Sequence, residues 1–451
     1  MRKGLLLLLA FLLLSACTNA EVPVVEISAP QKVVEATKEK QETVKAQWAE
    51  NVPPVTFTMD WSVDSSAEEV LLELIDPKYQ GRVTGSKGNR LAADWIENQF
   101  SDMGLQPMPG LDSYRHTYED ECFEVLPGYA AIVHPDGTET ELKLGEDWVF
   151  KPSAKELELT WPLCDDLVLC ETGEAILDGE KISQKSPKKA IEVFVGNVSG
   201  GFGYYNERYE ASRIMVTESV YEQLTAEGAK LHLSLPKAAF DGDVDNIVGY
   251  LPGEDNNKLV VLGAHFDGSG QCGTLLPGAY ANASGVATLM QTARWISQGD
   301  KLPCDVVFVA FNGSENGMDG SAEFARILDD HYKQILVVNM KCVGWAGEAL
   351  TLYSDTSEAF LNELAGALDI QYIADSFMGD QTCFRGATMQ ALTISQEAVL
   401  TKNEIGIVPG KTYDTVDNLD TMMLDELACK LAAWFLERGG DPVAEAIPVV
   451  W

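Results

Sequence analysis

A regular alternation of apolar runs and helical spacings after Asp245 is the strongest constraint on the fold of this 451-residue chain. Four short runs rich in Val, Ile and Leu predict buried strands at residues 246–251, 258–265, 305–311 and 335–340. Apolar residues at helical spacing predict helices at residues 284–297, 357–368 and 422–437. Strands that alternate with helices predict an α/β fold, in which a mostly parallel sheet has helices on both faces.

Polar side chains follow three of these strand runs directly: His265 and Asp267, then Ser314 and Glu315, then Lys341. The carboxyl ends of parallel strands meet at one edge of a sheet, and ligands bind at that edge in folds of this class. We therefore expect these side chains to lie close together. An imidazole and a carboxylate are also ligands that zinc takes in hydrolases.

Motifs in a fixed order extend this observation. The central ones are His-Phe-Asp at 265–267, Pro-Gly-Ala-Tyr-Ala-Asn-Ala-Ser-Gly at 277–285 and Gly-Ser-Glu-Asn-Gly-Met-Asp-Gly-Ser at 313–321. Further matches lie at residues 81–86, 104–105, 380–384 and 414–420. Together they resemble metallopeptidase family 28, which includes zinc aminopeptidases, glutamate-carboxypeptidase-like enzymes and the non-enzymatic transferrin receptor and nicastrin. The resemblance covers about residues 65–438 with one insertion, and it implies a zinc-aminopeptidase-like (phosphorylase/hydrolase-like) fold.

The resemblance also implies a site for two zinc ions, with five ligand positions and a glutamate that takes a proton from the bridging water. His265 and Glu315 stand at two of the ligand positions. Asp267 and Asp380 stand behind the ligands, where a carboxylate steadies a metal-binding imidazole.

The remaining ligand positions carry residues that do not bind zinc. Ala281 replaces the bridging aspartate and has no donor atom. Lys341 replaces a second aspartate, and an ammonium has no lone pair. Lys411, or Gly410 if the alignment shifts by one residue, stands where the last histidine belongs, and no histidine follows His331.

Ser314 replaces the proton-accepting glutamate, and a hydroxyl is no base at neutral pH without an activating partner. We therefore expect a degenerate metal site, no bound cofactor, and a protein that binds a peptide, glycan or protein partner without hydrolysis. Two alternatives stay open. One is an active zinc aminopeptidase that recruits unusual ligands such as Cys272 or Asp380, and the other is a structural component of the cell envelope.

The first residues are typical of a bacterial lipoprotein. Arg2 and Lys3 precede an apolar stretch, and Leu-Ser-Ala-Cys at 14–17 resembles a lipobox, in which Cys17 is lipidated. We expect a signal peptide at residues 1–17 and an extracytoplasmic protein anchored to the membrane through Cys17. Residues 18–54, rich in Glu, Lys, Val and Pro, predict a tether.

The rest of the chain divides into a peptidase-like domain and an insertion. Residues 55–112 form the first part of that domain, with helices expected at 66–75 and 88–103, and residues 241–451 form its main part. Between them, residues 113–240 alternate short apolar runs with Gly, Pro and Asp turns, which predicts a β-rich domain. Members of the family often carry a protease-associated insert at this place.

The formal net charge of -36 restricts the partners. Nucleic acids and anionic lipid surfaces bind clusters of Lys and Arg, so neither is expected as a partner of the folded part. No apolar stretch after the signal segment reaches the roughly 20 residues of a membrane-spanning helix.

Overall fold

The computed structural model describes residues 47–48, 66–150, 156–161, 174–177, 180–181, 191–196, 198, 212–329, 331–354, 358–375, 378–386, 389–396, 409–437 and 442–443. The predicted signal peptide with Cys17 lies outside these residues, as does all of the predicted tether except residues 47–48. Among the helices that the structure describes, none is long and apolar enough to cross a bilayer.

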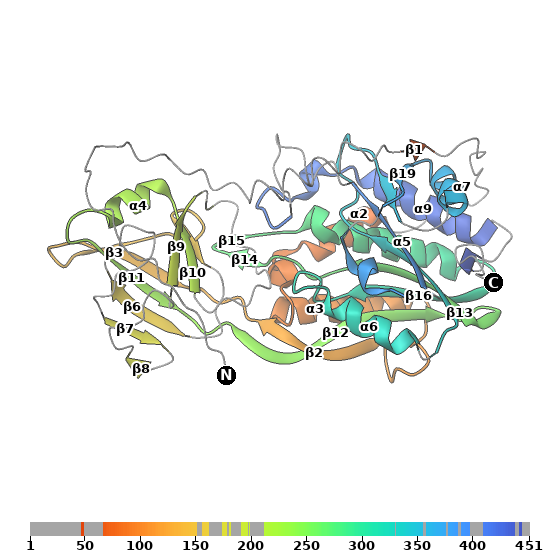
Figure 1. Cartoon of the computed structure of the whole chain (residues 1–451), viewed down its shortest axis with the longest axis horizontal. Coiled ribbons are helices and arrows are strands. Elements are labelled where there is room, and N and C mark those ends of the chain that lie inside the picture. Colours follow the sequence, from red (N-terminus) through yellow and green to blue (C-terminus); the bar gives the residue numbers. More distant parts are fainter. Residues whose placement is uncertain are drawn as a thin grey trace, which may run out of the picture. The chain divides into compact units, whose positions relative to one another are not determined.

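A nine-stranded sheet forms the centre of the peptidase-like part (Figure 1). In spatial order its strands are β1 (Gln47–Trp48), β19 (Gln371–Ile373), β18 (Thr351–Tyr353), β20 (Met389–Ser395), β17 (Gln334–Met340), β13 (Asp255–His265), β16 (Cys304–Phe311), β12 (Ala239–Leu251) and β2 (Arg115–Phe123). The four central strands, from β20 to β16, are parallel, whereas β12 and β2 pair antiparallel at one side and β18 pairs antiparallel with β20 at the other. The α/β prediction is therefore confirmed, with a parallel centre inside a mixed sheet.

Helices cover both faces of this sheet, as predicted. Alternate residues of a strand point to opposite faces. On one face, Val260 and Leu262 of β13 join a core with α2 (Ala67–Leu74), α3 (Lys87–Asp102), α5 (Ser284–Ser297), α7 (Glu358–Leu368) and α9 (Thr421–Glu437). On the other face, Leu259 and Val261 join a core with α6 (Asp319–Asp329) and with Phe384, which follows the short helix η5 (Asp380–Cys383). Helices α5 and α9 pack side by side (Figure 1).

Serine side chains begin the two N-terminal helices. The Ser66 hydroxyl accepts the Glu69 N–H at the start of α2, and the Ser86 hydroxyl accepts the Asn89 N–H at the start of α3. Such caps satisfy N–H groups that have no partner within the helix. The turn η1 (Pro77–Arg82) lies between the two helices.

The inserted part contains two further sheets and the helix α4 (Glu218–Leu224) around a core of its own. One sheet has the order β5 (Trp148–Phe150), β10 (Ser212–Val216), β9 (Ile191–Val195). The other has the order β4 (Glu139–Glu141), β3 (Tyr129–Val133), β11 (Lys230–Leu235), β6 (Leu157–Trp161), β7 (Glu174–Leu177), β8 (Glu180–Lys181).

The edges of the insertion differ from the predicted boundaries of 113 and 240. Strand β2 and only the first two residues of β12, Ala239 and Phe240, fall inside those boundaries, yet β2 and β12 pair with each other in the nine-stranded sheet, with Phe123 opposite Ala239. Alternating apolar residues indicate a strand without indicating the sheet that it joins, which explains the difference. A second difference concerns Gln47–Trp48. Composition placed these residues in the tether, whereas in the structure they form the strand β1 beside β19, a pairing that composition does not indicate.

Candidate functional site

The parallel centre of the sheet brings the predicted residues to one edge. Gly263 of β13 pairs with Asn339 of β17, and His265 pairs with Phe311 of β16. His265 therefore ends β13, while Ser314 and Glu315 follow β16 and Lys341 follows β17 at the same edge. We call His265, Asp267, Ser314, Glu315, Lys341 and Asp380 the strand-end cluster.

His265 is fully buried at the end of β13. Its Nδ1 lies 3.2 Å from the backbone oxygen of Asp267 and 3.4 Å from Oδ1 of the same residue. A carbonyl oxygen only accepts, so Nδ1 carries a proton and donates it. Nε2 has no hydrogen-bond partner among the described residues. Burial lowers the pKa of His265, but the hydrogen bond to Asp267 and the charges of Asp267 and Asp380 outweigh burial and raise it above its ordinary value.

Asp267 joins β13 to two other segments. Its Oδ2 accepts the backbone N–H of Glu315 at 2.8 Å and lies 3.4 Å from the hydroxyl of Thr84. The Glu315 side chain is partly exposed. Burial raises the pKa of Glu315, and the charges of His265 and Lys341 act against that rise.

Ser314 and Asp380 meet across the cluster. The Ser314 hydroxyl donates a short hydrogen bond to Oδ1 of Asp380, the first residue of η5. Oδ2 of Asp380 has no hydrogen-bond partner among the described residues, although the side chain is fully buried. The residue at the predicted general-base position is therefore a hydrogen-bond donor here.

The side chain of Lys341 extends past Gly379. A Cβ atom at Gly379 would stand 3.3 Å from Cδ of Lys341, so the lysine stem runs close to the backbone before Asp380. No ion pair within 4.0 Å joins Lys341 to Glu315 in the described part of the chain. The two charges still interact, because the ammonium lowers the pKa of both Glu315 and His265.

Ala281, at the predicted bridging position, lies buried in the 277–283 loop before α5. Arg82 binds the first residues of this loop, Pro277 and Gly278. Its guanidinium is fully buried and donates to four backbone oxygens, those of Leu74 (2.6 Å), Phe266 (2.8 Å), Pro277 (3.0 Å) and Gly278 (3.0 Å). One side chain thus ties the 277–283 loop to the end of β13 and to α2.

Asn282 and Asp414 complete the attachment of the loop. The Asn282 amide donates to the Met340 oxygen at 2.9 Å and accepts the Cys342 N–H at 2.9 Å, which joins the loop to the end of β17. Asp414 accepts the Tyr280 N–H at 2.5 Å and the Ala281 N–H at 3.2 Å. We call Arg82, Asn282 and Asp414 the loop network.

Sequence reasoning assigned no role to the loop network. All three residues lie inside the matched motifs, at 81–86, 277–285 and 414–420, but their side chains are not zinc ligands in this family's pattern. The sequence signal available for these residues was a polar side chain among apolar and glycine neighbours, which indicates a buried polar group. Its partners are 184 residues away in the case of Arg82 and Phe266, beyond the reach of any local pattern.

The last predicted position lies on a segment joined to the same loop. The Asp414 N–H donates to the Lys411 oxygen at 3.2 Å, so Lys411 stands one turn before the residue that holds Ala281. Burial lowers the pKa of Lys411. Cys342 is buried, and burial raises the pKa of its thiol to about 12, so it is no thiolate at neutral pH. The side chain of Cys272 lies outside the described residues.

The donors present do not fit the two-zinc centre that the resemblance implies. No group of three or more His, Cys, Asp or Glu side chains able to hold a metal ion occurs among the described residues. Asp267 is engaged by the Glu315 N–H and Asp380 by Ser314. A catalytic zinc takes three protein ligands, and His265 with Glu315 supplies two.

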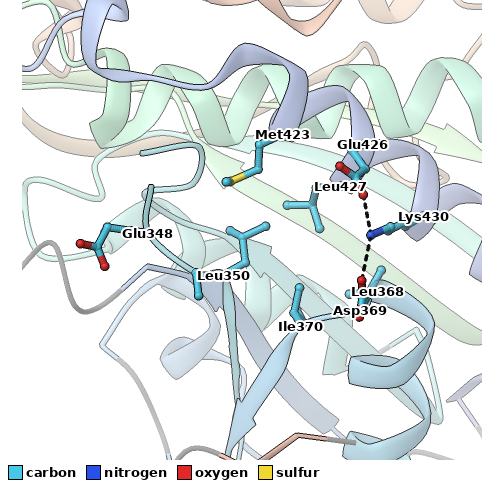
Figure 2. A pocket seen from close by; sticks show the side chains of 10 residues that line it. Glu348, Leu350, Leu368, Asp369, Ile370, Met423, Glu426, Leu427 and Lys430 are labelled. Carbon is cyan, nitrogen blue, oxygen red and sulfur yellow. Dashed lines mark ion pairs between the residues drawn. The ribbon is translucent and has the colours of Figure 1, made fainter. Parts of the chain in front are cut away.

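A cavity of about 210 Å³ lies between the loop before β18, the end of α7 and α9. Figure 2 shows its apolar walls and Lys430 between Glu426 (2.7 Å) and Asp369 (4.0 Å). None of the strand-end cluster residues lines it.

Comparisons with known proteins agree with the fold. Two solved structures resemble this chain: a zinc aminopeptidase from Bacillus subtilis (13% identity, TM-score 0.54, covering 85% of this chain and 99% of that one) and a peptidase M28 precursor from Shewanella amazonensis (14%, TM-score 0.50, 85% and 96%). Such low identity shows the fold alone.

Curated relatives match at slightly higher identity. The chain is 28% identical over 328 residues to leucine aminopeptidase 2 of Trichophyton equinum and 24% identical to a probable leucine aminopeptidase 2 of Arthroderma benhamiae. Each match covers 67% of this chain and 63% of the relative. The model of Peptidase family M28 matches residues 246–434. Residues 246–434 are therefore similar in sequence to peptidase family M28, and the fold resembles that of zinc aminopeptidases.

Proposed function

We propose that this protein is a peptidase-like binding protein, which holds a peptide, glycan or protein partner and does not hydrolyse it. The observation that carries the proposal is Lys341. This residue stands beside His265 and Glu315, at a position where the family pattern has a metal-binding aspartate. An ammonium has no lone pair to give to a metal, and its charge repels cations.

Ser314 supports the same proposal. A general base must take a proton from water, whereas the Ser314 hydroxyl gives its hydrogen bond to Asp380. Ala281 adds a third support, because it stands at the position of the bridging aspartate in the family pattern and has no donor atom. The loop that carries Ala281 is attached to Arg82 and Asp414.

The proposal of binding in place of hydrolysis rests on the polar side chains that the site exposes. Ser314, Glu315 and Lys341 are partly exposed, while His265 and Asp267 behind them are buried. A carboxylate and an ammonium that form no ion pair with each other offer complementary charges to peptide termini and side chains. We propose a peptide or protein ligand on this ground.

Hydrolysis and metal content test the proposal directly. Protein prepared without chelators should contain no stoichiometric zinc by elemental analysis and should not release nitroaniline from aminoacyl nitroanilides. The leucine aminopeptidase names of the relatives make leucine nitroanilide the first substrate to assay. Stoichiometric zinc together with chelator-sensitive turnover would establish the active zinc aminopeptidase instead.

Capture experiments separate binding from a purely structural role. Immobilised protein is offered peptides from native extracts, and the captured peptides are quantified by mass spectrometry. Glu315→Ala and Lys341→Ala should each reduce capture. Lys333→Ala is the matched control, because Lys333 is an exposed lysine just before the same strand β17. Equal capture by all four proteins would favour a structural envelope component.

We also propose that the protein is anchored outside the cytoplasm through lipidated Cys17. The support is the lipobox-like sequence at 14–17. Cys17→Ser should move the protein from the membrane fraction to the soluble fraction when it is expressed in a bacterial host. Continued sedimentation of the variant with membranes contradicts a lipid anchor at this residue.

A further inference from the structure

The strand-end cluster contains more buried negative charge than its hydrogen bonds explain. Asp267 and Asp380 are fully buried; Oδ2 of Asp380 has no hydrogen-bond partner among the described residues, and Oδ1 of Asp267 has only Nδ1 of His265, at 3.4 Å. A buried carboxylate without a balancing charge destabilises a fold by several kcal/mol. Glu315 adds a third, partly exposed carboxylate at the same edge.

Metallopeptidase folds balance such carboxylates with metal ions, and the donors here do not fit a metal centre. The cations of the chain must therefore be considered. Arg82 is close enough for its charge to act on Asp267, but all four of its described hydrogen bonds go to backbone oxygens. His265 is held at Nδ1 by Asp267 itself.

Lys341 is the remaining cation beside the cluster among the described residues. Gly379 leaves room for its stem, since a Cβ there would lie 3.3 Å from Cδ of Lys341 and 2.6 Å from Oε1 of Gln381. The Lys341 stem thus lies next to Gly379, the residue that precedes Asp380 in the sequence. The charge of Lys341 acts on His265 and Glu315.

We infer that the Lys341 ammonium takes the electrostatic place of a divalent metal ion, so that the fold holds its buried carboxylates without any bound cation. The inference rests on the proposed function, in which the metal is absent. It adds that the loss is compensated from within the chain. Replacing the aspartate by lysine removes a ligand and supplies the missing positive charge in one change.

Thermal unfolding with and without zinc tests this inference. Lys341→Met removes the charge and keeps the stem, and it should lower the midpoint of unfolding by roughly 5 °C. Lys341→Asp should lower it further in chelator, and millimolar zinc should restore part of the loss, because His265, Glu315 and the new carboxylate supply three donors. Zinc should not shift the wild-type midpoint.

Two control variants make the result specific. Lys341→Arg keeps the charge and should unfold near the wild-type temperature with no response to zinc. Lys333→Met and Lys333→Asp change an exposed lysine at the other end of β17 and should have no effect in either buffer. If Lys341→Met unfolds with the wild-type protein, the inference is overturned, and it is equally overturned if Lys341→Asp ignores zinc.

The outcomes also distinguish this inference from the proposed function. Zinc that stabilises the wild-type protein and accompanies peptide hydrolysis refutes the proposed function. A wild-type protein without zinc, combined with a neutral Lys341→Met variant, refutes only the role of Lys341 as the replacement charge. Should Lys341→Asp fail to fold, the comparison of Lys341→Met with Lys341→Arg still decides the question.

Discussion

The loop network and the strand-end cluster adjoin at the end of β13, where Asn282 donates to the His265 oxygen, and they differ in how well their polar groups are satisfied. Arg82, Asn282 and Asp414 give all their buried side-chain atoms a partner among the described residues. The cluster leaves Nε2 of His265 and one oxygen each of Asp267 and Asp380 without one. Buried polar groups without partners destabilise a fold and persist where function or its remnant required them. The buried polar atoms of the loop network are thus satisfied, whereas some of those in the strand-end cluster are not.

The loop network should therefore matter most for stability. Arg82→Met leaves four backbone oxygens without a buried donor, and we expect a loss of about 3–5 kcal/mol in the free energy of unfolding, measured with urea. Arg326→Met is the control, because Arg326 is an exposed arginine of α6, paired only with Glu323, and should change stability by less than about 0.5 kcal/mol. Equal effects of the two variants would abolish the distinction between the regions.

Asp414→Asn should give a smaller loss that depends on pH. Burial raises the pKa of Asp414 to about 7, although the Tyr280 and Ala281 N–H groups and Arg82 act against the rise. An unfolded aspartate titrates near ~3.9. Between these values the folded protein holds a proton that the unfolded chain has released, so this group makes stability fall as pH rises from about 4 to about 7.

The asparagine variant cannot titrate and should lack that part of the pH profile. At pH 5 we expect it to be about 1–3 kcal/mol less stable than the wild type, with the gap narrowing as pH rises toward 7 and staying constant above it. Urea unfolding at several pH values between 4.5 and 8 measures both profiles. Parallel profiles for the two proteins would contradict the raised pKa.

The cluster should tolerate substitution better than the loop network. Ser314→Ala removes one hydrogen bond to Asp380, and we expect a loss of about 1 kcal/mol. The side chain is partly exposed, so water can replace the lost donor. A loss as large as that of Arg82→Met would show that Ser314 is part of the scaffold.

Local patterns in the sequence predicted the central elements closely. Helix α5 spans the predicted residues 284–297, and β13, β16 and β17 end where the apolar runs end. The contact between Asp267 and Glu315 followed from the parallel order of β13 and β16. Periodicity and strand order are both local properties of such a fold, which is why they were predictable.

Long-range partnerships were not predictable. The hydrogen bond between Ser314 and Asp380 spans 66 residues, and Lys341 does not form the ion pair with Glu315 that its charge suggests. Strand β20 and the membership of β2 in the main sheet also depend on pairing with distant segments. A sequence pattern reports which face of an element is apolar, and it does not report which distant group will satisfy a given polar atom.

The insertion begins and ends at neighbouring points of the strands β2 and β12. The chain leaves the main sheet at Phe123 and returns at Ala239, which lie directly opposite each other at the end of one antiparallel ladder, and the Glu124 N–H donates to the Ala238 oxygen at 2.9 Å. A tight turn joining these two points would close an ordinary hairpin. The residues between Phe123 and Ala239 can therefore be replaced by another segment without a change in the pairing register of β2 and β12.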